Sequence, residues 1–502
     1  LTAEVHWPTR IGEAPAPLPR NKPRPYQNVA IQDVVKGFRK HDRGQLIMAC
    51  GTGKTLTALW IAEKLASRRT FVLVPSLSLI SQTLVAWGRN CTKPFDYLVV
   101  CSDETVIHKG EDAAVTSTSE LGVPVTTDVG TIRQFLTRRR KKPAVVFATY
   151  QSSDRVAAAQ AASNPSFDLA LADEAHRCTG PADGLFTTVL DAAKIKARRR
   201  LFMTATPRYF TGRVKKRAEE LEYELASMDD EARFGPVFHR LAFDAAIRAD
   251  LLTDYQVVVI GVTQAELRRW AEEGRLVRTQ DGLQTDARTL AAQIGLAKAM
   301  RQHDLRKLIT FHSSVAKASR FTDAAVADSL PGVIQRMSPG SRPSGQLWTA
   351  NISGHTPAGK RSTLLTVFGT LPDGTRGVLS NCACLGEGVD VPVLDGVAFI
   401  DPKRSMIDII QAVGRVIRKA DDKRIGTVVI PVFVDESADA DHALTHSAFE
   451  PVWQVLKALR AHDPKLADEL DALRLKLGER SRAGGKLRLP DKIRVDVPTL
   501  VL

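Results

Sequence analysis

The chain has 502 residues, of which 44% are hydrophobic and 25% are charged. These fractions match ordinary globular proteins, and they exclude a chain that is disordered throughout or collagen-like. Lys and Arg number 70 against 56 Asp and Glu, which gives a formal net charge of +14. Excess positive charge favours polyanionic partners, although a basic surface that serves solubility alone fits the charge equally well.

The six cysteines are scattered along the chain, and none lies in a C-x-x-C pair. This spacing is unlike a disulfide framework or a four-cysteine zinc site, and it favours a reducing, cytoplasmic location. We recognise no signal peptide and no window of about 18 apolar residues, so we expect no membrane partner. Because the chain starts with Leu1 rather than Met, we expect it to be a piece of a longer polypeptide.

The first half of the chain predicts an α/β domain. Residues 1–23 are rich in proline and predict an extended lead-in to a domain over 24–240. Apolar runs that alternate with helical patterns predict a parallel sheet covered on both faces. These runs lie at 45–50, 71–74, 98–101, 144–148, 169–172 and 201–203. We interpret the polar stretch 102–143 as an insertion.

A second α/β series occupies residues 241–435. Its strands are predicted at 257–260, 307–311, 377–380, 397–400 and 427–430. Leucines recur at helical spacing within 436–502, which predicts a helical C-terminal extension. The expected fold is therefore α/β, with two tandem parallel-sheet domains and a helical extension.

A glycine-rich loop at 51–55 follows a predicted strand and precedes a predicted helix. Glycines let backbone N–H groups surround phosphates, and the helix N-terminus adds its positive dipole. We expect Lys54 to reach the β- and γ-phosphates and Thr55 to hold Mg²⁺. Met48 stands where the fuller form of this motif has glycine, and an ordinary helix cap is the alternative.

Two carboxylates, Asp173 and Glu174, follow the apolar run 169–172. The carboxyl edge of a parallel sheet is where open α/β proteins bind ligands. We expect Asp173 to hold Mg²⁺ through water and Glu174 to orient or deprotonate an attacking water. His176 is expected to link this site to other groups. A solvated strand end is the alternative, but the loop at 51–55 on the same predicted sheet favours catalysis.

Positive charge for a transition state is available at Arg415 and Arg418, which one face of a helix can present together. Arginine matches phosphate oxygens and stays charged, as an arginine finger requires. A solvated basic helix end, continued by Lys419, is the alternative. If both domains contribute to one site, that site lies in the cleft between them, and hydrolysis can open and close the cleft.

The ordered motifs over residues 24–420 resemble those of superfamily 2 helicases and translocases with two RecA-like domains. Residues 24–27 resemble the adenine-recognition motif, 51–55 motif I, and 173–176 motif II in its DEAH form. Residues 384–392 resemble motif V and 411–418 motif VI. The resemblance implies an ATP hydrolase that uses Mg²⁺. It implies catalytic roles for Lys54, Asp173, Glu174, Gln411, Arg415 and Arg418, and nucleotide binding by Arg24, Tyr26, Gln27, Cys50, Gly51, Thr52, Gly53, Lys54, Thr55, Gly388 and Asp390.

The remaining motifs imply coupling and nucleic-acid contact. Residues 204–207 resemble motif III, 74–82 motif Ia, 148–152 motif Ib and 311–314 motif IV. In the family, motif III couples the state of ATP to nucleic acid. The implied coupling residues are His176, Thr204 and Thr206, and the implied nucleic-acid contacts are Pro75, Ser76, Gln82, Thr149, Tyr150, His312, Ser313 and Thr356.

Residues 43–55 and 448–453 also resemble the motors of single-polypeptide, Type I-like restriction-modification enzymes. In such enzymes a nuclease precedes the motor, and a coupler and a methyltransferase follow it. The resemblance therefore implies nuclease and methyltransferase modules on the full-length polypeptide, with residues 436–502 as the start of the coupler. An RNA or DNA unwinding helicase outside restriction and a non-catalytic, ATP-gated clamp stay open as alternatives.

Two runs of Arg and Lys, at 138–142 and 194–200, remain without a role in these motifs. Such runs are usually solvated, and contact with a duplex is the alternative for the second run. Aromatic residues make up 6% of the chain and form no visible ladder. This disfavours a single-strand channel based on stacking and favours contact with the phosphates of double-stranded DNA.

Overall fold

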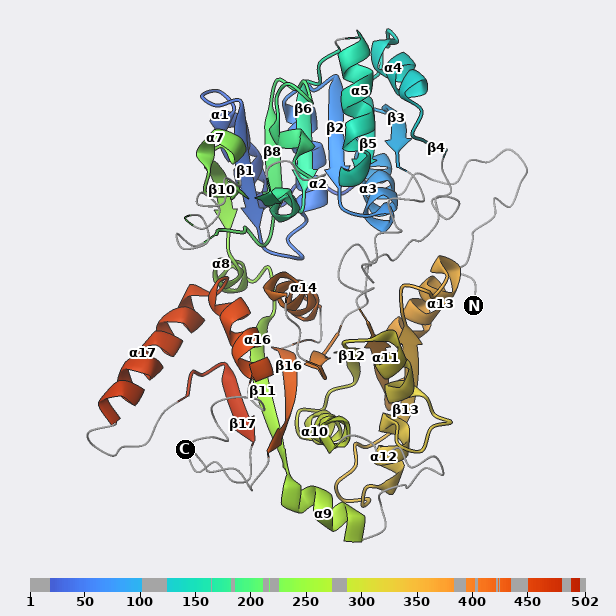
Figure 1. Cartoon of the computed structure of the whole chain (residues 1–502), viewed down its shortest axis with the longest axis vertical. Coiled ribbons are helices and arrows are strands. Elements are labelled where there is room, and N and C mark those ends of the chain that lie inside the picture. The colour runs from blue at the N-terminus through green and yellow to red at the C-terminus, as the bar shows by residue number, and fades with distance from the viewer. Residues whose placement is uncertain are drawn as a thin grey trace.

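The computed structural model describes residues 19–101, 124–163, 165–181, 186–210, 216, 225–272, 287–382, 394–401, 405–420, 423, 425–434, 450–480 and 489–496. Most of the lead-in, part of the predicted insertion, and the predicted site residues Gly388 and Asp390 lie outside these ranges. Figure 1 shows two α/β lobes, the first above the second, with helices α8 (Phe243–Arg248) and α14 (Met406–Val416) between them. Within the described ranges, no helix is long and apolar enough to cross a membrane.

The first lobe is built on an eight-stranded sheet in which every pairing is parallel. Its central strands are mostly apolar and are buried along nearly their whole length, because helices cover both faces. Val72, for example, pairs with Phe147 on one side and Leu171 on the other. In spatial order the strands are β10 (Val237–Leu241), β1 (Arg43–Met48), β8 (Arg200–Thr204), β6 (Leu169–Asp173), β2 (Arg69–Val74), β5 (Ala144–Thr149), β3 (Asp96–Val100) and β4 (Val125–Thr126).

Helices cover the two faces of this sheet and form two apolar cores. On one face lie α1 (Pro25–Gly37), α2 (Lys54–Lys64) and α3 (Leu77–Asn90), and on the other lie α4 (Val129–Thr137) and α5 (Ser153–Ser163). The short helix α7 (Glu231–Phe234) and the two-stranded antiparallel pair β7 (Gly180–Pro181) and β9 (Leu225–Ala226) complete the lobe.

The structure corrects the interpretation of 102–143 as one insertion. Its second part belongs to the first lobe, because β4 pairs with β3 at the edge of the sheet and α4 packs on α5. Ile132 and Leu136 of α4 are buried in the core of this face. The polar surface of α4 hid this amphipathic pattern in a stretch that is hydrophilic on average.

The second lobe is built on a seven-stranded parallel sheet. In spatial order its strands are β13 (Gln346–Ile352), β14 (Thr375–Asn381), β12 (Lys307–Phe311), β15 (Gly396–Phe399), β16 (Ile425–Val434), β11 (Asp254–Thr263) and β17 (Ile493–Asp496). Besides α8 and α14, its helices are α9 (Gln264–Glu272), α10 (Ala287–Gln302), α11 (Val315–Thr322), α12 (Leu330–Arg336), α13 (Ala358–Gly369), α16 (Glu450–Arg460) and α17 (Pro464–Arg480). The pair β11 and β16 runs in register over ten residues, and β11 is buried along most of its length.

The C-terminal extension packs on the second lobe instead of standing apart from it. Leu456, Leu459 and Leu466 are buried in the same core as α14. The extension is helical over α16 and α17, as predicted, but it also contains a strand that the sequence did not predict. This strand, β17, adds to β11 as the outermost member of the second sheet.

A buried ionic cluster fixes the extension to the sheet. Asp463, which is fully buried, accepts hydrogen bonds from the Tyr255 hydroxyl at 2.7 Å and from Lys492 Nζ at 3.0 Å. Asp463 also caps α17 by accepting from Leu466 N, and Lys492 forms an ion pair with Asp254 at 2.8 Å. Burial alone would raise the pKa of Asp463, but the hydrogen bonds from Tyr255 and Lys492 outweigh it and lower that pKa.

We predict that Asp463→Ala lowers the free energy of unfolding by about 3 kcal/mol or more, because it leaves Lys492 and Tyr255 buried without their shared acceptor. Urea denaturation at neutral pH measures this loss. The pKa of Asp463 is lowered by folding, so its contribution is present at neutral pH and is lost as the pH falls below about 4. The difference between wild type and variant should therefore shrink on acidification.

The matched control is Lys465→Ala on the same helix. Lys465 pairs with Glu469 at 3.8 Å on the surface, and exposed pairs of this kind contribute under about 1 kcal/mol. Equal stability of the two variants would contradict the assignment of Asp463 as the anchor of the extension.

Candidate nucleotide-binding and hydrolysis site

The glycine-rich loop lies between β1 and α2, as predicted. Gly51 and Gly53 both have φ of +81°, a conformation that L side chains rarely adopt. A Cβ atom at Gly53 would also lie 2.6 Å from the Gln27 side-chain nitrogen. The two glycines therefore keep the backbone N–H groups of this loop accessible at the N-terminus of α2, as phosphate binding requires.

The Lys54 ammonium bends back over this loop, and its Nζ lies 3.3 Å from the carbonyl oxygen of Met48. Burial alone would lower the pKa of Lys54, but the nearby Cys50, Glu174 and Asp173 side chains outweigh it and raise that pKa. The lysine is therefore charged at neutral pH and lies beside both acids of the site.

The acids lie at the carboxyl end of β6, as predicted. Glu174 follows Asp173 in a left-handed conformation with φ of +49°, and its backbone N–H donates to Asp173 Oδ1 at 3.0 Å. Burial alone would raise the pKa of Glu174, but its hydrogen bond with His176 and the charge of Lys54 outweigh it and lower that pKa to about 2. Glu174 is therefore an ionised carboxylate beside a lysine.

Glu174 is joined to His176, Thr204 and Thr206 by a chain of polar contacts. His176 Nδ1 lies 3.4 Å from Glu174 Oε2, 3.0 Å from Thr204 Oγ1 and 3.1 Å from Thr206 Oγ1. The Thr204 hydroxyl also contacts Glu174 Oε2 at 3.5 Å. The three predicted coupling residues thus form one buried cluster that connects the acids to the end of β8.

The predicted adenine-recognition residues support the glycine-rich loop from the side of α1. The Tyr26 hydroxyl and the Gln27 side-chain N–H donate to the carbonyl oxygen of Thr52 at 2.9 Å and 3.2 Å. Gln27 Oε1 accepts from the backbone N–H of Arg24, which lines the same cavity as the loop. Both polar atoms of the Gln27 amide are therefore engaged with backbone groups.

The second lobe closes over this loop through α14. A Cβ atom at Gly414 would lie 2.4 Å from the Cβ of Cys50, so the helix backbone approaches the loop as closely as a glycine permits. A Cβ atom at Gly51 would lie 3.4 Å from Arg418 Cγ. Residue pairs from the two lobes are thus in van der Waals contact at the loop.

One cavity of about 1010 Å³ lies at this junction and is lined by both lobes. All six predicted catalytic residues and the predicted metal ligands line it. The cavity residues from the first lobe include Arg24, Cys50, Gly51, Gly53, Lys54, Thr55, Asp173 and Glu174, and those from the second include Gln411, Gly414, Arg415 and Arg418. The structure therefore brings together side chains that are more than 350 positions apart in the sequence.

The segment that joins the lobes also contacts the C-terminal end of α14, the helix that carries Arg415 and leads to Arg418 and is called the arginine helix below. The sequence did not predict this contact. Leu252 pairs with Arg418 in an isolated antiparallel bridge, and the backbone N–H of Thr253 donates to the carbonyl oxygen of Ile417 at 2.8 Å. Leu251 lines the cavity itself. No local pattern marks these residues, because their role depends on contact with a helix 160 positions away.

Several residues that are predicted to contact nucleic acid have side chains engaged within the protein. The side chains of Thr149, Tyr150 and His312 are buried, and the Tyr150 hydroxyl donates to the carbonyl oxygen of Asp173 at 2.6 Å. Tyr150 therefore supports the acids from beneath. Gln82, on α3, lines the interlobe cavity.

The other predicted contacts are Pro75, Ser76, Ser313 and Thr356, and they differ in burial and in local hydrogen bonding. Pro75 is buried, and the Ser76 hydroxyl caps α3 by accepting from Leu79 N. Ser313 is exposed beside Asp401, which its hydroxyl contacts at 3.0 Å. Thr356 Oγ1 accepts from Ser353 N in the turn before α13. Of the eight predicted contacts, Ser313 is the exposed one that lies outside the interlobe cavity.

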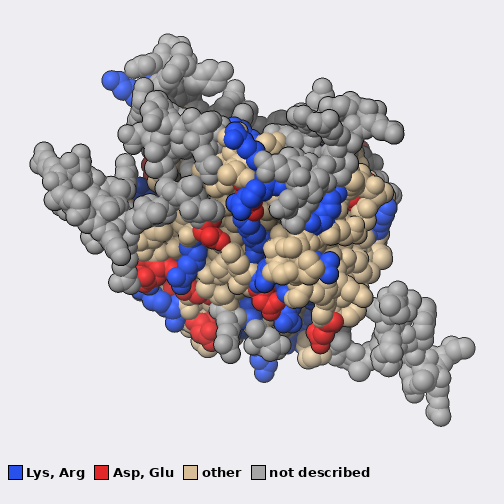
Figure 2. Space-filling model, turned by 90° about the horizontal axis from the view of Figure 1, so that it is seen from below, with Lys and Arg blue, Asp and Glu red and all other residues tan. Residues whose placement is uncertain are grey.

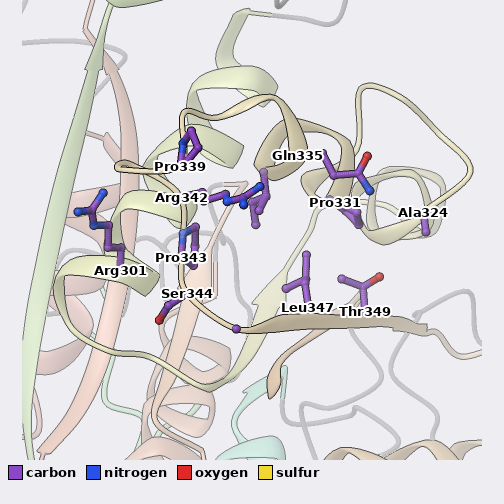
Figure 3. A pocket seen from close by; sticks show the side chains of 12 residues that line it. Arg301, Ala324, Pro331, Gln335, Pro339, Arg342, Pro343, Ser344, Leu347 and Thr349 are labelled. Atoms are coloured by element: carbon purple, nitrogen blue, oxygen red, sulfur yellow. The ribbon is translucent and has the colours of Figure 1, made fainter. Parts of the chain in front are cut away.

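A second cavity, of about 740 Å³, lies in the second lobe between α12, β13 and the loop before β13 (Figure 3). Figure 3 shows the Arg342 side chain extending across this cavity, whereas the Arg301 side chain points away from it. Its described lining holds no carboxylate and none of the predicted site residues. It therefore offers no acid or base for hydrolysis.

The chain matches two known families. Residues 20–209 match the family described as "Type III restriction enzyme, res subunit", and residues 297–420 match the "Helicase conserved C-terminal domain". The chain is 27% and 28% identical over 453 residues to "Probable helicase A859L" from two African swine fever virus isolates, Pretoriuskop Pr4 and Badajoz 1971. These alignments cover 89% of the chain and 45% of each viral protein, so the chain spans less than half the length of these relatives.

Two solved structures resemble the chain over nearly its whole length. One is the ATP-dependent Type ISP restriction-modification enzyme LlaBIII bound to DNA, with a TM-score of 0.80, 29% identity, and coverage of 95% of this chain and 31% of the enzyme. The other is a nuclease-deletion mutant of the Type ISP enzyme LlaGI with a DNA substrate mimic, with a TM-score of 0.61, 26% identity, and coverage of 94% and 30%. This chain is a superfamily 2 helicase with two parallel-sheet lobes, close in fold to the motors of Type ISP restriction-modification enzymes.

Proposed function

We propose that the chain is a DEAH-type, ATP-hydrolysing motor that moves along double-stranded DNA within a restriction-modification or phage-defence protein. The observation that carries this proposal is the single cavity in which Lys54 and Glu174 of one lobe face Arg415 and Arg418 of the other. Hydrolysis at such a junction changes the contacts between the lobes, and alternation between closed and open lobes is the elementary step of a motor.

The residues of the cavity fit a nucleoside triphosphate with Mg²⁺. The loop at 51–55 presents backbone N–H groups and the Lys54 ammonium to phosphates. Thr55 and Asp173 supply hydroxyl and carboxylate oxygens, which are the ligands that Mg²⁺ prefers. When bound, Mg²⁺ neutralises charge on the β- and γ-phosphate oxygens.

Glu174 would position the attacking water. Its lowered pKa makes it a weak base, so orienting the water by accepting a hydrogen bond fits it better than early removal of a proton. Lys54 would hold the phosphates, and Arg415 and Arg418 would stabilise the charge on the phosphoryl group in the transition state. Through the contacts of His176, Thr204 and Thr206, a change in the position or hydrogen bonding of Glu174 would shift the end of β8.

The choice of duplex DNA rests on the relatives and on the charge. The solved relatives are in complex with DNA or with a DNA substrate mimic, and this chain has a formal net charge of +14. The nuclease and methyltransferase modules, the coupler role of residues 436–502 and a cytoplasmic location remain predictions for the full-length protein. The RNA or DNA unwinding helicase and the non-catalytic clamp are the alternatives that the following experiments separate from a duplex motor.

Two substitutions test the hydrolysis site. We predict that Lys54→Ala lowers ATPase activity by about 10³-fold or more, because the phosphates lose their charge partner in a low-dielectric cavity. We predict that Glu174→Gln stops turnover yet keeps ATP binding, since the amide fills the same space. Steady-state ATPase rates and equilibrium binding of a fluorescent ATP analogue measure the two effects. Rapid turnover by Glu174→Gln would remove its assigned role, and slow turnover by the wild type would favour a clamp.

A third substitution tests closure of the lobes. Gly414→Ala places a methyl group 2.4 Å from the Cys50 Cβ, so α14 must move and displace Arg415 and Arg418. We expect kcat to fall about 10²-fold, the effect of misplacing a reacting group by about 1 Å. Gly359→Ala on α13 is the control, because nothing lies within 4 Å of a Cβ there.

Adding Cys50→Gly to Gly414→Ala removes the steric clash and should recover at least part of kcat, measured against Cys50→Gly alone. If the double variant is as slow as Gly414→Ala, the contact between Cys50 and Gly414 is not what positions the arginines.

Strand-displacement assays test whether the motor moves along intact double-stranded DNA. A motor that moves along intact duplex should release the third strand of a DNA triplex in an ATP-dependent reaction and separate the two strands of a plain duplex poorly. Duplex DNA should also stimulate the ATPase more than RNA does. Efficient duplex unwinding without triplex release would support the unwinding helicase instead.

A further inference from the structure

The outer edge of the first sheet, where its strands begin, is rich in basic residues. Because all eight strands are parallel, the segments that precede them meet along this edge, opposite the glycine-rich loop and the acids. It is the upper end of the molecule in Figure 1. Basic residues precede or begin four of five adjacent strands. We call them the basic edge: Arg39, Lys40 and Arg43 at β1; Lys194, Lys196, Arg198 and Arg199 at β8; Arg68 and Arg69 at β2; and Arg138, Arg139, Arg140, Lys141 and Lys142 at β5.

Hydrogen bonds connect these segments into one surface. The Arg68 guanidinium donates to the carbonyl oxygen of Arg140 at 3.0 Å, which joins the starts of β2 and β5. The backbone N–H groups of Arg68 and Arg69 donate to Asp168 Oδ2, just before β6. The backbone N–H of Arg200 donates to the carbonyl oxygen of Asp42, which joins the starts of β8 and β1. The two runs of basic residues in the sequence therefore belong to the same face.

The acids at this edge are already engaged. Asp42 pairs with Arg43 at 3.5 Å, Asp96 pairs with Arg140 at 3.1 Å, and Asp168 is held by two backbone N–H groups. Arg200 differs from its neighbours, because it is buried and donates to backbone carbonyl oxygens. Its burial anchors the run 194–199. The side chains of Arg139, Lys142, Lys194 and Arg198 are exposed, so the edge keeps a surplus of positive charge at its surface.

On the surface of the second lobe, positive and negative side chains are mixed. Figure 2, seen from below, shows Lys and Arg side chains on the underside of this lobe with Asp and Glu side chains among them. Ion pairs in this lobe join Lys298 to Glu266 at 2.7 Å and Asp304 to both Arg306 and Arg376. A general need for solubility is met by such interspersed charges, so it does not account for the one-sided charge of the basic edge.

We propose that the basic edge binds the phosphate backbone of duplex DNA, separately from the nucleotide cleft. The strands from β1 to β5 are four steps apart, and neighbouring strands lie about 4.8 Å apart, so the edge is about 19 Å wide. That width matches about six base pairs of duplex, which carry about 11 phosphates along the helix axis. Lysine and arginine side chains at this spacing can contact successive phosphates without reading bases. The choice of DNA rests on the proposed function.

An acidic protein is the less suitable partner for this surface. Protein interfaces depend on apolar anchors that are buried at their centre. The large apolar side chains exposed near this edge are Tyr97 on β3 and Val237 on β10, in the part of the chain that the structure describes. These two strands lie on opposite sides of the sheet, six steps apart, so the two side chains form no common patch. The basic edge instead carries positive charges spread along its width, which matches the evenly spaced phosphates of a nucleic acid.

A second contact of this kind would keep the motor on its track. The cleft must open once in every ATP cycle, and a phosphate contact on the rigid body of one lobe does not depend on that opening. Counterion release makes such a contact strong at low salt and weak at high salt. The basic edge should therefore lower the rate at which the motor leaves DNA and leave the rate of the chemical step unchanged.

The test compares two variants of the whole chain that lose the same charge. The basic-edge variant carries Arg139→Gln, Lys142→Gln, Lys194→Gln and Arg198→Gln. The control variant carries four exposed substitutions in the second lobe and the extension: Arg268→Gln, Arg269→Gln, Arg342→Gln and Lys457→Gln. Binding of a labelled duplex of random sequence is measured over a range of KCl concentrations. Thermal unfolding and ATPase activity without DNA verify that both variants fold.

For the basic-edge variant we expect an affinity at least about tenfold below that of the control variant at low salt. The slope of log K against log salt should also become shallower by about 0.9 for each phosphate contact that is lost. Equal affinities and equal slopes in the two variants would overturn the proposal and leave the surface to an acidic protein partner. Failure of the wild-type chain to bind duplex DNA or respond to it in the ATPase assay would overturn the proposed function as well.

Discussion

The contact between the glycine-rich loop and the arginine helix is the constraint on which the site depends. The loop belongs to one sheet and the helix to the other, so the site is complete when Gly414 packs against Cys50. The segment between the lobes pairs with the end of this same helix through Leu252 and Thr253. The segment that connects the lobes therefore also holds Arg415 and Arg418 in position. A movement of one lobe relative to the other changes the distance between these arginines and the glycine-rich loop.

The charged side chains at this junction interact strongly with one another and with any charged group in the cavity. Lys54, Glu174 and the two arginines share a cavity in which water screens charges less than it does at the surface. The Lys54 charge helps to keep Glu174 ionised, and His176 connects Glu174 to Thr204 at the end of β8 and to Thr206 just after it. A phosphate that arrives or leaves must change the balance among these groups. The buried cluster gives that change a route into the sheet that does not require a contact with solvent.

The sequence predicts those parts of the molecule that local chemistry determines. Lys54 and Glu174 can be recognised because glycines and acids at strand ends have few uses, and the strand at 307–311 agrees with β12 because a buried strand is apolar along its length. By contrast, β13 is a half-buried edge strand of mixed composition, and β17 is a strand because it pairs with β11. A motif gives the order of residues such as Tyr150 and Gln82, whereas the direction of each side chain follows from packing. The sequence therefore did not predict the hydrogen bond from Tyr150 to Asp173 or the place of Gln82 on the interlobe cavity.

The two edges of the first sheet carry different chemistry for a reason that follows from parallel strands. At the carboxyl edge, loops such as 51–53 must bend sharply and pack against the second lobe, so they use glycine. Asp173 there is buried, and Glu174 is hydrogen-bonded to His176. At the amino edge, the chain returns from helices on the surface, so long basic side chains can be added without disturbing a core. A motor needs both a closed site that excludes water and an open surface that holds a polyanion. A parallel sheet keeps the two apart by the length of its strands, about 17–20 Å. For the proposed motor, that separation would let the cleft open and close while the proposed phosphate contact at the amino edge stays in place.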